Sequence, residues 1–135
     1  MIVDASVLIA SANSRDPDSR RSRDLLRANA TESLFVPALA LAEAAYLIQA
    51  RLGARAEIAL ARSLTLAPWV IEAPNHDDLT RAIVLMVQYV DLPLGLSDAL
   101  AVALAERLGE TRVASLDHHF RVVRPSHVQA FEVLP

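Results

Sequence analysis

The chain contains neither cysteine nor lysine. Without cysteine, it can form no disulfide framework and no thiolate metal site. Without lysine, it cannot use a Schiff-base lysine, a P-loop lysine or the lysine of a receiver domain. It has no apolar run of the roughly 18 to 20 residues that would suggest a membrane span, and its opening residues lack the pattern of a signal peptide. These absences favour a cytoplasmic protein with no membrane partner.

The composition is that of a compact globular protein. Of the 135 residues, 53% are hydrophobic and 21% are charged, which allows a substantial core and makes disorder improbable. This length predicts a single domain over residues 1–135. The net charge is −3, and all thirteen positive residues are arginine. Mild acidity does not exclude a nucleic-acid partner, because local arginines can hold phosphates beside clustered carboxylates.

Apolar segments and polar breaks alternate along the chain in a pattern typical of strands and helices. Strands are expected at 2–3, 34–36, 69–71, 112–116 and 128–133. Helices are expected at 7–12, 18–30, 38–52, 54–66, 75–90 and 97–108, with a turn or short helix at 118–120. This order predicts an α/β fold with a mostly parallel central sheet of about four to five strands flanked by helices.

Two acidic residues directly follow predicted strands. Asp4 comes after the strand at 2–3, and Asp117 comes after the strand at 112–116. In an open parallel sheet, ligands bind beyond the carboxyl ends of the strands. We therefore expect both carboxylates at the same edge of the sheet, in the region where such folds place their ligand sites.

Two further acids are isolated in apolar segments. Glu43 is the only charged residue in the segment 33–50, and its neighbours at helical spacing are apolar. Asp98 is likewise the only charge in the segment 92–105. An unpartnered carboxylate on an apolar stripe costs roughly several kcal/mol. A distant arginine, protonation or a metal ion must therefore compensate each charge.

Convergence of the four acids would create a strongly self-repelling cluster. A divalent cation relieves that repulsion, and hard oxygen ligands suit Mg²⁺ or Mn²⁺. Such sites support phosphodiester hydrolysis by activated water, with one metal ion or two. The sequence therefore predicts a metal-dependent nuclease whose catalytic and metal-binding residues are Asp4, Glu43, Asp98 and Asp117.

Three of these acids also have structural explanations. Asp4 is a favoured helix N-cap residue. Asp98 can favour the helix dipole from a first turn that Ser97 caps, and Asp117 can be an ordinary turn residue. Glu43 has no comparable explanation. The expected convergence of all four acids favours a shared metal site, because helix caps and turn residues that serve only local structure need not gather at one edge of one sheet.

Hydroxyl and imidazole groups lie beside the predicted acids. Ser6 and Ser115 each stand two residues from one of them, where a hydroxyl can orient a metal ligand or bound water. Local bonding to the backbone explains both serines equally well. His118 and His119 directly follow Asp117. A solvated pair of histidines is the expected arrangement, although one of them can also touch a phosphate.

A basic segment and two apolar helices each have more than one possible function. Five arginines between residues 15 and 27 form a basic segment that can hold RNA phosphates or receive an acidic partner, but a solvated helix face is the commoner case. The predicted helices at 38–52 and 54–66 are more apolar than one small core needs. They can also form a dimer interface or a groove for a partner helix.

Together these motifs resemble the PIN-domain ribonucleases. The resemblance rests on Ile2-Val3-Asp4-Ala5-Ser6, the lone Glu43, Ser97-Asp98-Ala99 and Ser115-Leu116-Asp117-His118-His119-Phe120, in this order. The length and the element order resemble the VapC-type toxins of bacterial toxin–antitoxin pairs. The resemblance covers essentially the whole chain and implies a PIN-like α/β/α sandwich.

The resemblance also implies an activity. It suggests a Mg²⁺- or Mn²⁺-dependent endoribonuclease that inhibits translation by cleaving tRNA or ribosomal RNA, commonly as a homodimer and under the control of a cognate antitoxin protein. The family's acidic quartet falls on Asp4, Glu43, Asp98 and Asp117. Ser6 matches the hydroxyl after the first acid. Ser115 stands where the family often has threonine, which preserves the hydroxyl.

The same residues bear on functions of other classes. A haloacid-dehalogenase-like phosphatase needs a second aspartate two residues after Asp4, where this chain has Ser6. A catalytically inactive PIN-fold module that binds RNA or protein stays open. Pairing of one of the four acids with an arginine, away from any cleft, would favour that module.

Overall fold

The computed structural model describes residues 1–135 and contains one five-stranded sheet. All strand pairs are parallel, in the order β3-β2-β1-β4-β5. The strands are β1 (Ile2–Val3), β2 (Leu34–Pro37), β3 (Trp69–Glu72), β4 (Arg112–Ala114) and β5 (Glu132–Leu134). The predicted parallel sheet of about four to five strands is confirmed, with five strands.

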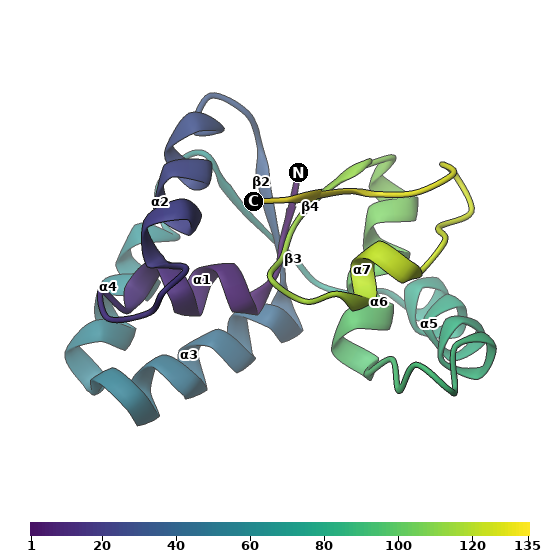
Figure 1. Cartoon of the computed structure of the whole chain (residues 1–135), viewed down its shortest axis with the longest axis horizontal. Helices are drawn as coiled ribbons and strands as arrows, with labels where there is room; N and C mark the ends of the chain where they lie inside the picture. Colours follow the sequence, from purple (N-terminus) through teal and green to yellow (C-terminus); the bar gives the residue numbers. More distant parts are fainter.

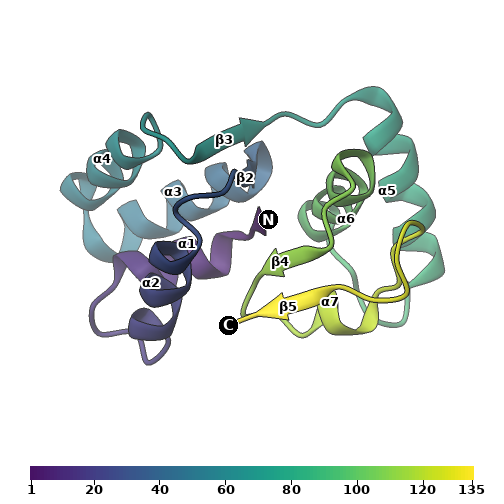
Figure 2. The same cartoon turned by 90° about the horizontal axis from the view of Figure 1, so that it is seen from above.

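Helices cover both faces of the sheet. One face carries α1 (Ala5–Ala12), α2 (Ser19–Ala28), α3 (Ala38–Leu52) and α4 (Ala54–Ser63) (Figures 1 and 2). The other face carries α5 (His76–Gln88), α6 (Leu96–Leu108) and the short α7 (His119–Val122). The result is the expected α/β/α sandwich. None of these helices combines the length and the hydropathy that crossing a bilayer requires.

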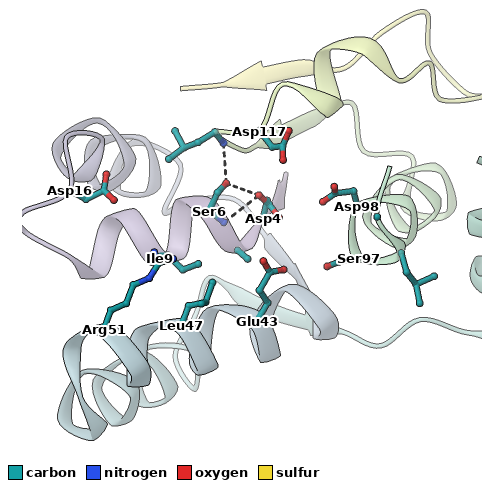
Figure 3. Close-up of a pocket in the computed structure, with 14 residues that line it drawn as sticks. Asp4, Ser6, Ile9, Asp16, Glu43, Leu47, Arg51, Ser97, Asp98 and Asp117 are labelled. Atoms are coloured by element: carbon teal, nitrogen blue, oxygen red, sulfur yellow. Dashed lines mark hydrogen bonds between the residues drawn. The ribbon is translucent and has the colours of Figure 1, made fainter. Parts of the chain in front are cut away.

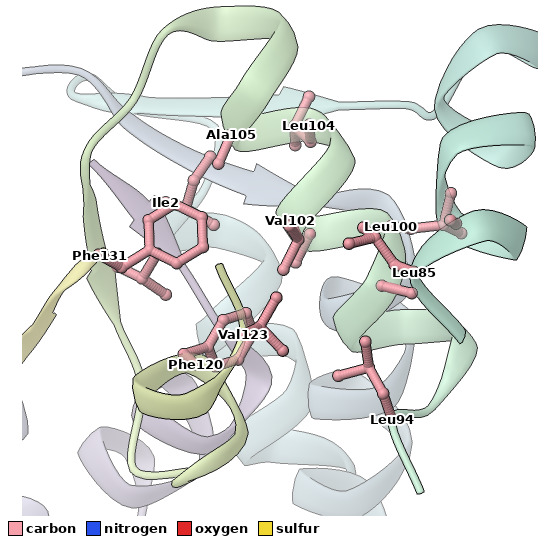
Figure 4. Close-up of a cluster of buried hydrophobic side chains, with 14 residues drawn as sticks. Ile2, Leu85, Leu94, Leu100, Val102, Leu104, Ala105, Phe120, Val123 and Phe131 are labelled. Atoms are coloured by element: carbon pink, nitrogen blue, oxygen red, sulfur yellow. The ribbon is translucent and has the colours of Figure 1, made fainter. Parts of the chain in front are cut away.

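Successive residues of the central strands feed two separate hydrophobic cores. Ile2 and Val113 join Phe120 in the core beneath α5, α6 and α7 (Figure 4). Val3 and Ala114 point to the opposite face and join the core beneath α1 and α3. Burying a large aliphatic side chain contributes about 1.5–3 kcal/mol, so packing on both faces fixes the register of the short strands.

Several element boundaries differ from the predictions. The helices predicted at 18–30, 54–66 and 75–90 end earlier, at Ala28, Ser63 and Gln88 respectively. Turns follow all three ends. Apolar residues continue into these turns, because side chains also pack outside helices. Periodicity therefore does not indicate the residue at which a helix ends.

The two last strands are shorter than predicted. β4 ends at Ala114 instead of residue 116, because the Leu116 amide donates to the Ser6 hydroxyl and not to a neighbouring strand. β5 starts at Glu132 instead of residue 128, because its only partner, β4, pairs through three residues. Asp117 consequently lies on a loop beyond the strand end and does not follow the strand directly.

The strand order creates a crevice beside β1. The chain runs from β1 through β2 to β3 on one side, and later returns to place β4 on the other side of β1. α1 leaves β1 toward one face, while α7 follows β4 on the other face (Figure 1). In parallel sheets, such reversals of strand order open ligand sites at the carboxyl ends of the strands.

Candidate active site

A cleft of about 510 Å³ opens at the carboxyl ends of β1 and β4 (Figure 3). Its walls come from α1, α3, the start of α6 and the loop after β4. All four acids predicted from the sequence line this cleft, namely Asp4, Glu43, Asp98 and Asp117. The fold therefore brings together carboxylates that are separated by more than a hundred residues along the chain.

Each acid comes from a different element. Asp4 is the N-cap residue of α1, directly after β1. Glu43 lies in the second turn of α3, and Asp98 lies in the first turn of α6. Asp117 lies on the loop between β4 and α7. Because four elements contribute, the arrangement depends on the tertiary fold and is not a by-product of one helix terminus.

Asp4 is fixed by hydroxyl groups. Its side chain is only 7% exposed. One oxygen, Oδ2, accepts hydrogen bonds from Ser6 Oγ at 2.6 Å, Ser115 Oγ at 2.9 Å and the Ser6 amide at 3.3 Å. These bonds leave Oδ1 to a ligand in the cleft. Asp4 therefore caps α1 through Oδ2, and the predicted role as a ligand would use the other oxygen.

The two serines also tie the far wall of the cleft to α1. Ser6 Oγ accepts from the Leu116 amide, and Ser115 Oγ accepts from the Asp117 amide, both at 3.0 Å. Ser115 is buried, with 1% of its surface exposed. Local backbone bonding and orientation of a carboxylate were alternative explanations of these serines, and the structure contains both kinds of bond.

His119 bridges two of the acids. Its Nδ1 lies 3.2 Å from Asp98 Oδ2 and 3.3 Å from Asp117 Oδ1, and its amide donates to the same Asp117 oxygen at 2.9 Å. The expectation of a solvated histidine pair is right for His118, which is largely exposed, and wrong for His119, which is mostly buried. His119 reaches Asp98 because α7 packs against α6, a contact that local sequence does not specify.

The carboxylates raise one another's affinity for protons. The pKa of Glu43 is raised, first by partial burial of its carboxyl group in the cleft, although the residue as a whole is exposed, and then by the negative charges of Asp4 and Asp98. The pKa of Asp98 is also raised, chiefly by burial; the His119 hydrogen bond opposes this shift, while Asp4 and Asp117 add to it. A cluster that is destabilised by its own negative charge favours a bound cation.

Glu43 corrects one step of the sequence argument. We expected its carboxylate on a shielded apolar stripe, but Glu43 is exposed, and its neighbour Tyr46 is also exposed. The buried face of α3 carries Ala40, Ala44 and Ile48 instead. α3 is apolar almost all round, so its sequence does not indicate which face packs on the sheet. The position of Glu43 at the cleft was predicted correctly, although for a partly wrong reason.

The start of α6 also differs in detail. Its N-cap residue is Gly95 and not Ser97, because the helix already begins at Leu96. Asp98 keeps the predicted place in the first turn. Ser97, freed from capping, lines the cleft beside Asp98 (Figure 3).

The donor set fits a hard divalent cation. None of the four acids forms an ion pair with an arginine; the arginine ion pairs of the chain involve other carboxylates. Carboxylate oxygens without an arginine partner are the ligands that Mg²⁺ and Mn²⁺ prefer. The one trio of carboxylate or imidazole side chains whose ligand atoms all lie within 4.8 Å of one another is Asp117, His118 and His119. Imidazole nitrogens at this end suit Mn²⁺ better than Mg²⁺.

Comparison with known proteins assigns the chain to a family. The sequence model of the PIN domain matches residues 1–124. The chain belongs to the PIN-domain family. It is also 31% identical over 136 residues to Ribonuclease VapC26 of Mycobacterium tuberculosis (strain ATCC 25618 / H37Rv), and the match covers 100% of both sequences. The recognition of a VapC-type PIN domain from the four sequence motifs is thereby confirmed.

The fold of this PIN domain also resembles a solved structure. The crystal structure of Mycobacterium tuberculosis VapC20, described as a Sarcin-Ricin loop cleaving toxin, superposes with a TM-score of 0.83. The match covers 95% of this chain and 98% of that chain at 22% sequence identity. The predicted PIN-like sandwich is thus confirmed, and the family membership makes this chain a VapC-type ribonuclease, a hydrolase.

Proposed function

We propose that this VapC-type PIN domain is a divalent-metal-dependent endoribonuclease and the toxin of a toxin–antitoxin pair. The observation that carries the proposal is the gathering of four carboxylates from four elements in one cleft, without arginine partners. The raised pKa values of Glu43 and Asp98, caused first by burial and then by the neighbouring carboxylates, support a cation at this place. The alternative of an inactive binding module would be favoured by an arginine-paired acid, and the cleft offers none.

The four acids would hold Mg²⁺ or Mn²⁺ between the walls of the cleft. When bound, such an ion supplies a water of lowered pKa and stabilises negative charge on the phosphate oxygens. Ser6 and Ser115 keep Asp4 in one orientation by binding its Oδ2, so that Oδ1 is presented to the cleft. His119 holds the carboxylates of Asp98 and Asp117 near each other.

The reaction proposed is hydrolysis of the RNA backbone by water. In-line attack by water, and not by the ribose 2′-hydroxyl, leaves a 5′-phosphate and a 3′-hydroxyl. The substrate class proposed is a structured RNA, either tRNA or a ribosomal RNA loop, and its cleavage would inhibit translation in the cytoplasm. The description of VapC20 as a toxin that cleaves the sarcin–ricin loop supports this class of substrate. A cognate antitoxin protein is the partner expected of such a toxin.

The function is tested by incubating purified, partner-free protein with total RNA in Mn²⁺, Mg²⁺ or EDTA. We expect cleavage in either metal ion and none in EDTA, because the acidic cleft cannot stabilise a phosphate without a cation. Ligation-based mapping of the new ends should find 5′-phosphates. Ends that carry 2′,3′-cyclic phosphate would refute water attack. No cleavage of any RNA, together with no Mn²⁺ binding by calorimetry, would favour the non-catalytic module.

We also infer that the protein forms a homodimer through α5. This helix lies on the outer side of the molecule (Figure 2). It exposes large apolar side chains at helical spacing, namely Leu79, Ile83, Val84 and Val87, and the exposed Val90 follows in the turn after it. Contiguous apolar surface of this kind marks interaction sites, and a two-fold dimer can bury the same face of both copies.

Substitution of Val87 by glutamate should convert the dimer to a monomer. Val87 is 70% exposed in the single chain, so the variant should fold normally, but two buried carboxylates would face each other across the dimer. Sedimentation velocity measures the change. T111E, which adds the same charge at an exposed position outside α5, should remain dimeric. A wild-type protein that is monomeric throughout the micromolar range would refute the inference.

The apolar surface predicted on the helices at 38–52 and 54–66 is separate from the exposed face of α5. An apolar groove of about 340 Å³ runs between α3 and α4, and its apolar lining consists of Leu41, Ala45, Leu60, Ala61, Leu64 and Ile71. A dimer interface or a partner helix at this groove stays a prediction. The exposed stripe on α5 is the better support for a dimer, because its side chains project from the surface and do not line a concavity.

A further inference from the structure

The cleft poses an electrostatic problem for a polyanionic substrate. Five acids line it, the fifth being Asp16, and together they face a single basic residue, Arg51. Metal ions at the four-acid end would neutralise that end only. An RNA strand that continues through the cleft needs another positive charge for its neighbouring phosphates, since phosphate contacts supply most of the affinity for nucleic acids.

Arg51 lies at the end of the cleft opposite Asp98 (Figure 3). It belongs to the last turn of α3 and is exposed. Arg51 is not among the arginines that form ion pairs with carboxylates in this chain. A guanidinium without a carboxylate partner, on the wall of a strongly acidic cleft, is available to an external anion.

The residues between the two ends form an apolar floor. Glu43, Leu47 and Arg51 follow one another at intervals of four residues, so they share one face of α3, and all three line the cleft. Ile9 of α1 lies opposite, beside Leu47 (Figure 3). Eight residues of helix span about 12 Å, so Arg51 is too far along α3 to share a phosphate with the four-acid end. A short stretch of the RNA strand can lie over Leu47 and Ile9, with one phosphate at the four-acid end and another at Arg51.

Other arginines do not offer the same contact. The arginines of the basic segment at 15–27 were candidates for binding RNA phosphates, but none of them lines the cleft. Within that segment, Arg21 pairs with Asp18, and Arg20 and Arg27 lie within 4 Å of Asp24. Of the thirteen arginines of the chain, Arg51 alone lines the cleft.

We propose that Arg51 forms a phosphate subsite that holds the RNA backbone beside the scissile linkage. The proposal rests on the proposed ribonuclease function and adds where the strand runs: from the four-acid end, over Leu47 and Ile9, to Arg51. The planar guanidinium can donate two parallel hydrogen bonds to one phosphate, which fixes the strand's position as well as binding it. Arg51 is thus a substrate-binding residue and not a metal ligand.

The test compares R51A, R51K and R55A on one labelled RNA with a mapped cleavage site. Arg55 is a matched control, since it is also exposed and unpaired but lies outside the cleft. Affinity is measured by fluorescence anisotropy in Ca²⁺ at several KCl concentrations, and kcat and KM are measured in Mn²⁺. Calorimetry with Mn²⁺ alone, and thermal unfolding, establish that each variant keeps its metal affinity and its fold.

We expect R51A to raise Kd and KM about tenfold at low salt, the effect of one charge-assisted contact, with little change in kcat. The slope of log Kd against log salt should fall by about 0.7, the value for one phosphate contact on a single strand. R51K should keep most of the slope, and R55A should match the wild type. A methylphosphonate at the phosphate that Arg51 holds should weaken the wild type but leave R51A unaffected.

The outcomes separate this proposal from the one on which it rests. If the wild type binds and cleaves RNA while R51A behaves as R55A does, the subsite is refuted and the ribonuclease function stands. If R51A instead loses Mn²⁺ affinity, Arg51 acts on the metal-binding end and the subsite is again refuted. If the wild type neither binds nor cleaves RNA in metal, the proposed function itself fails.

Discussion

Replacement of Asp4 by asparagine is expected to lower the rate of RNA cleavage by at least about 10³-fold, because an ion that supplies several kcal/mol of transition-state stabilisation loses a ligand. The change is otherwise conservative. The asparagine oxygen can still accept the hydrogen bonds that Ser6 Oγ and Ser115 Oγ donate to Oδ2. The negative charge is lost, and with it the attraction of Asp4 for a cation. Single-turnover cleavage of an end-labelled RNA in Mn²⁺ measures the loss.

Two controls make the D4N result interpretable. D91N removes an exposed carboxylate that does not line the cleft, and its cleavage rate should equal that of the wild type. Thermal unfolding of D4N should show that the fold is intact. Equal cleavage by D4N and wild type would point to a contaminating nuclease and would remove the biochemical support for the carboxylate site.

The sequence predicted which acids gather in the cleft because their surroundings along the chain are distinctive. Asp98 is the only charged residue in a long apolar segment, and Asp4 directly follows an apolar strand. Such contrasts between one charge and its neighbours need no knowledge of the fold. Parallel topology then places strand ends at one edge, which brings Asp4 and Asp117 to the same cleft.

What the sequence did not predict depends on contacts between distant elements. His119 contacts Asp98 only because α7 packs against α6. The local sequence shows two adjacent histidines after Asp117, a pattern that predicts solvent exposure for both. Nothing in the sequence distinguishes Arg51 from the other twelve arginines, because its place at the cleft depends on the packing of α1 opposite α3. The exposure of Glu43 follows from the face that α3 turns to the sheet, which a helix rich in alanine and leucine does not encode in its periodicity.

Divalent metal is expected to raise the melting temperature, and to raise it more at neutral than at acidic pH. A ligand at a hundred times its Kd stabilises the folded state by about 2.7 kcal/mol, which corresponds to roughly 10 °C for a domain of this size. Differential scanning fluorimetry in Mn²⁺ and in EDTA measures the shift. D4N should lose most of it, since the variant keeps the hydroxyl network but lacks the charge.

The pH dependence follows from the direction of the pKa shifts. The pKa values of Glu43 and Asp98 are raised above the ordinary values of these side chains, so folding favours the protonated forms. The stability that these groups contribute is fully present below their unfolded pKa values and is lost as pH rises through the folded ones. The metal-free protein therefore carries its full internal repulsion at neutral pH, where a cation relieves most.

The difference between the Mn²⁺ and EDTA curves isolates the cleft, because groups elsewhere contribute equally to both. Glu106, for example, has a lowered pKa from its Arg81 hydrogen bond, and its stabilisation grows with pH whether metal is present or not. The metal-induced rise should grow from about pH 4 toward pH 7, as protons cease to compete for the carboxylates. E43Q should flatten this growth. A metal-induced rise that does not vary with pH would show that the cation binds away from these acids.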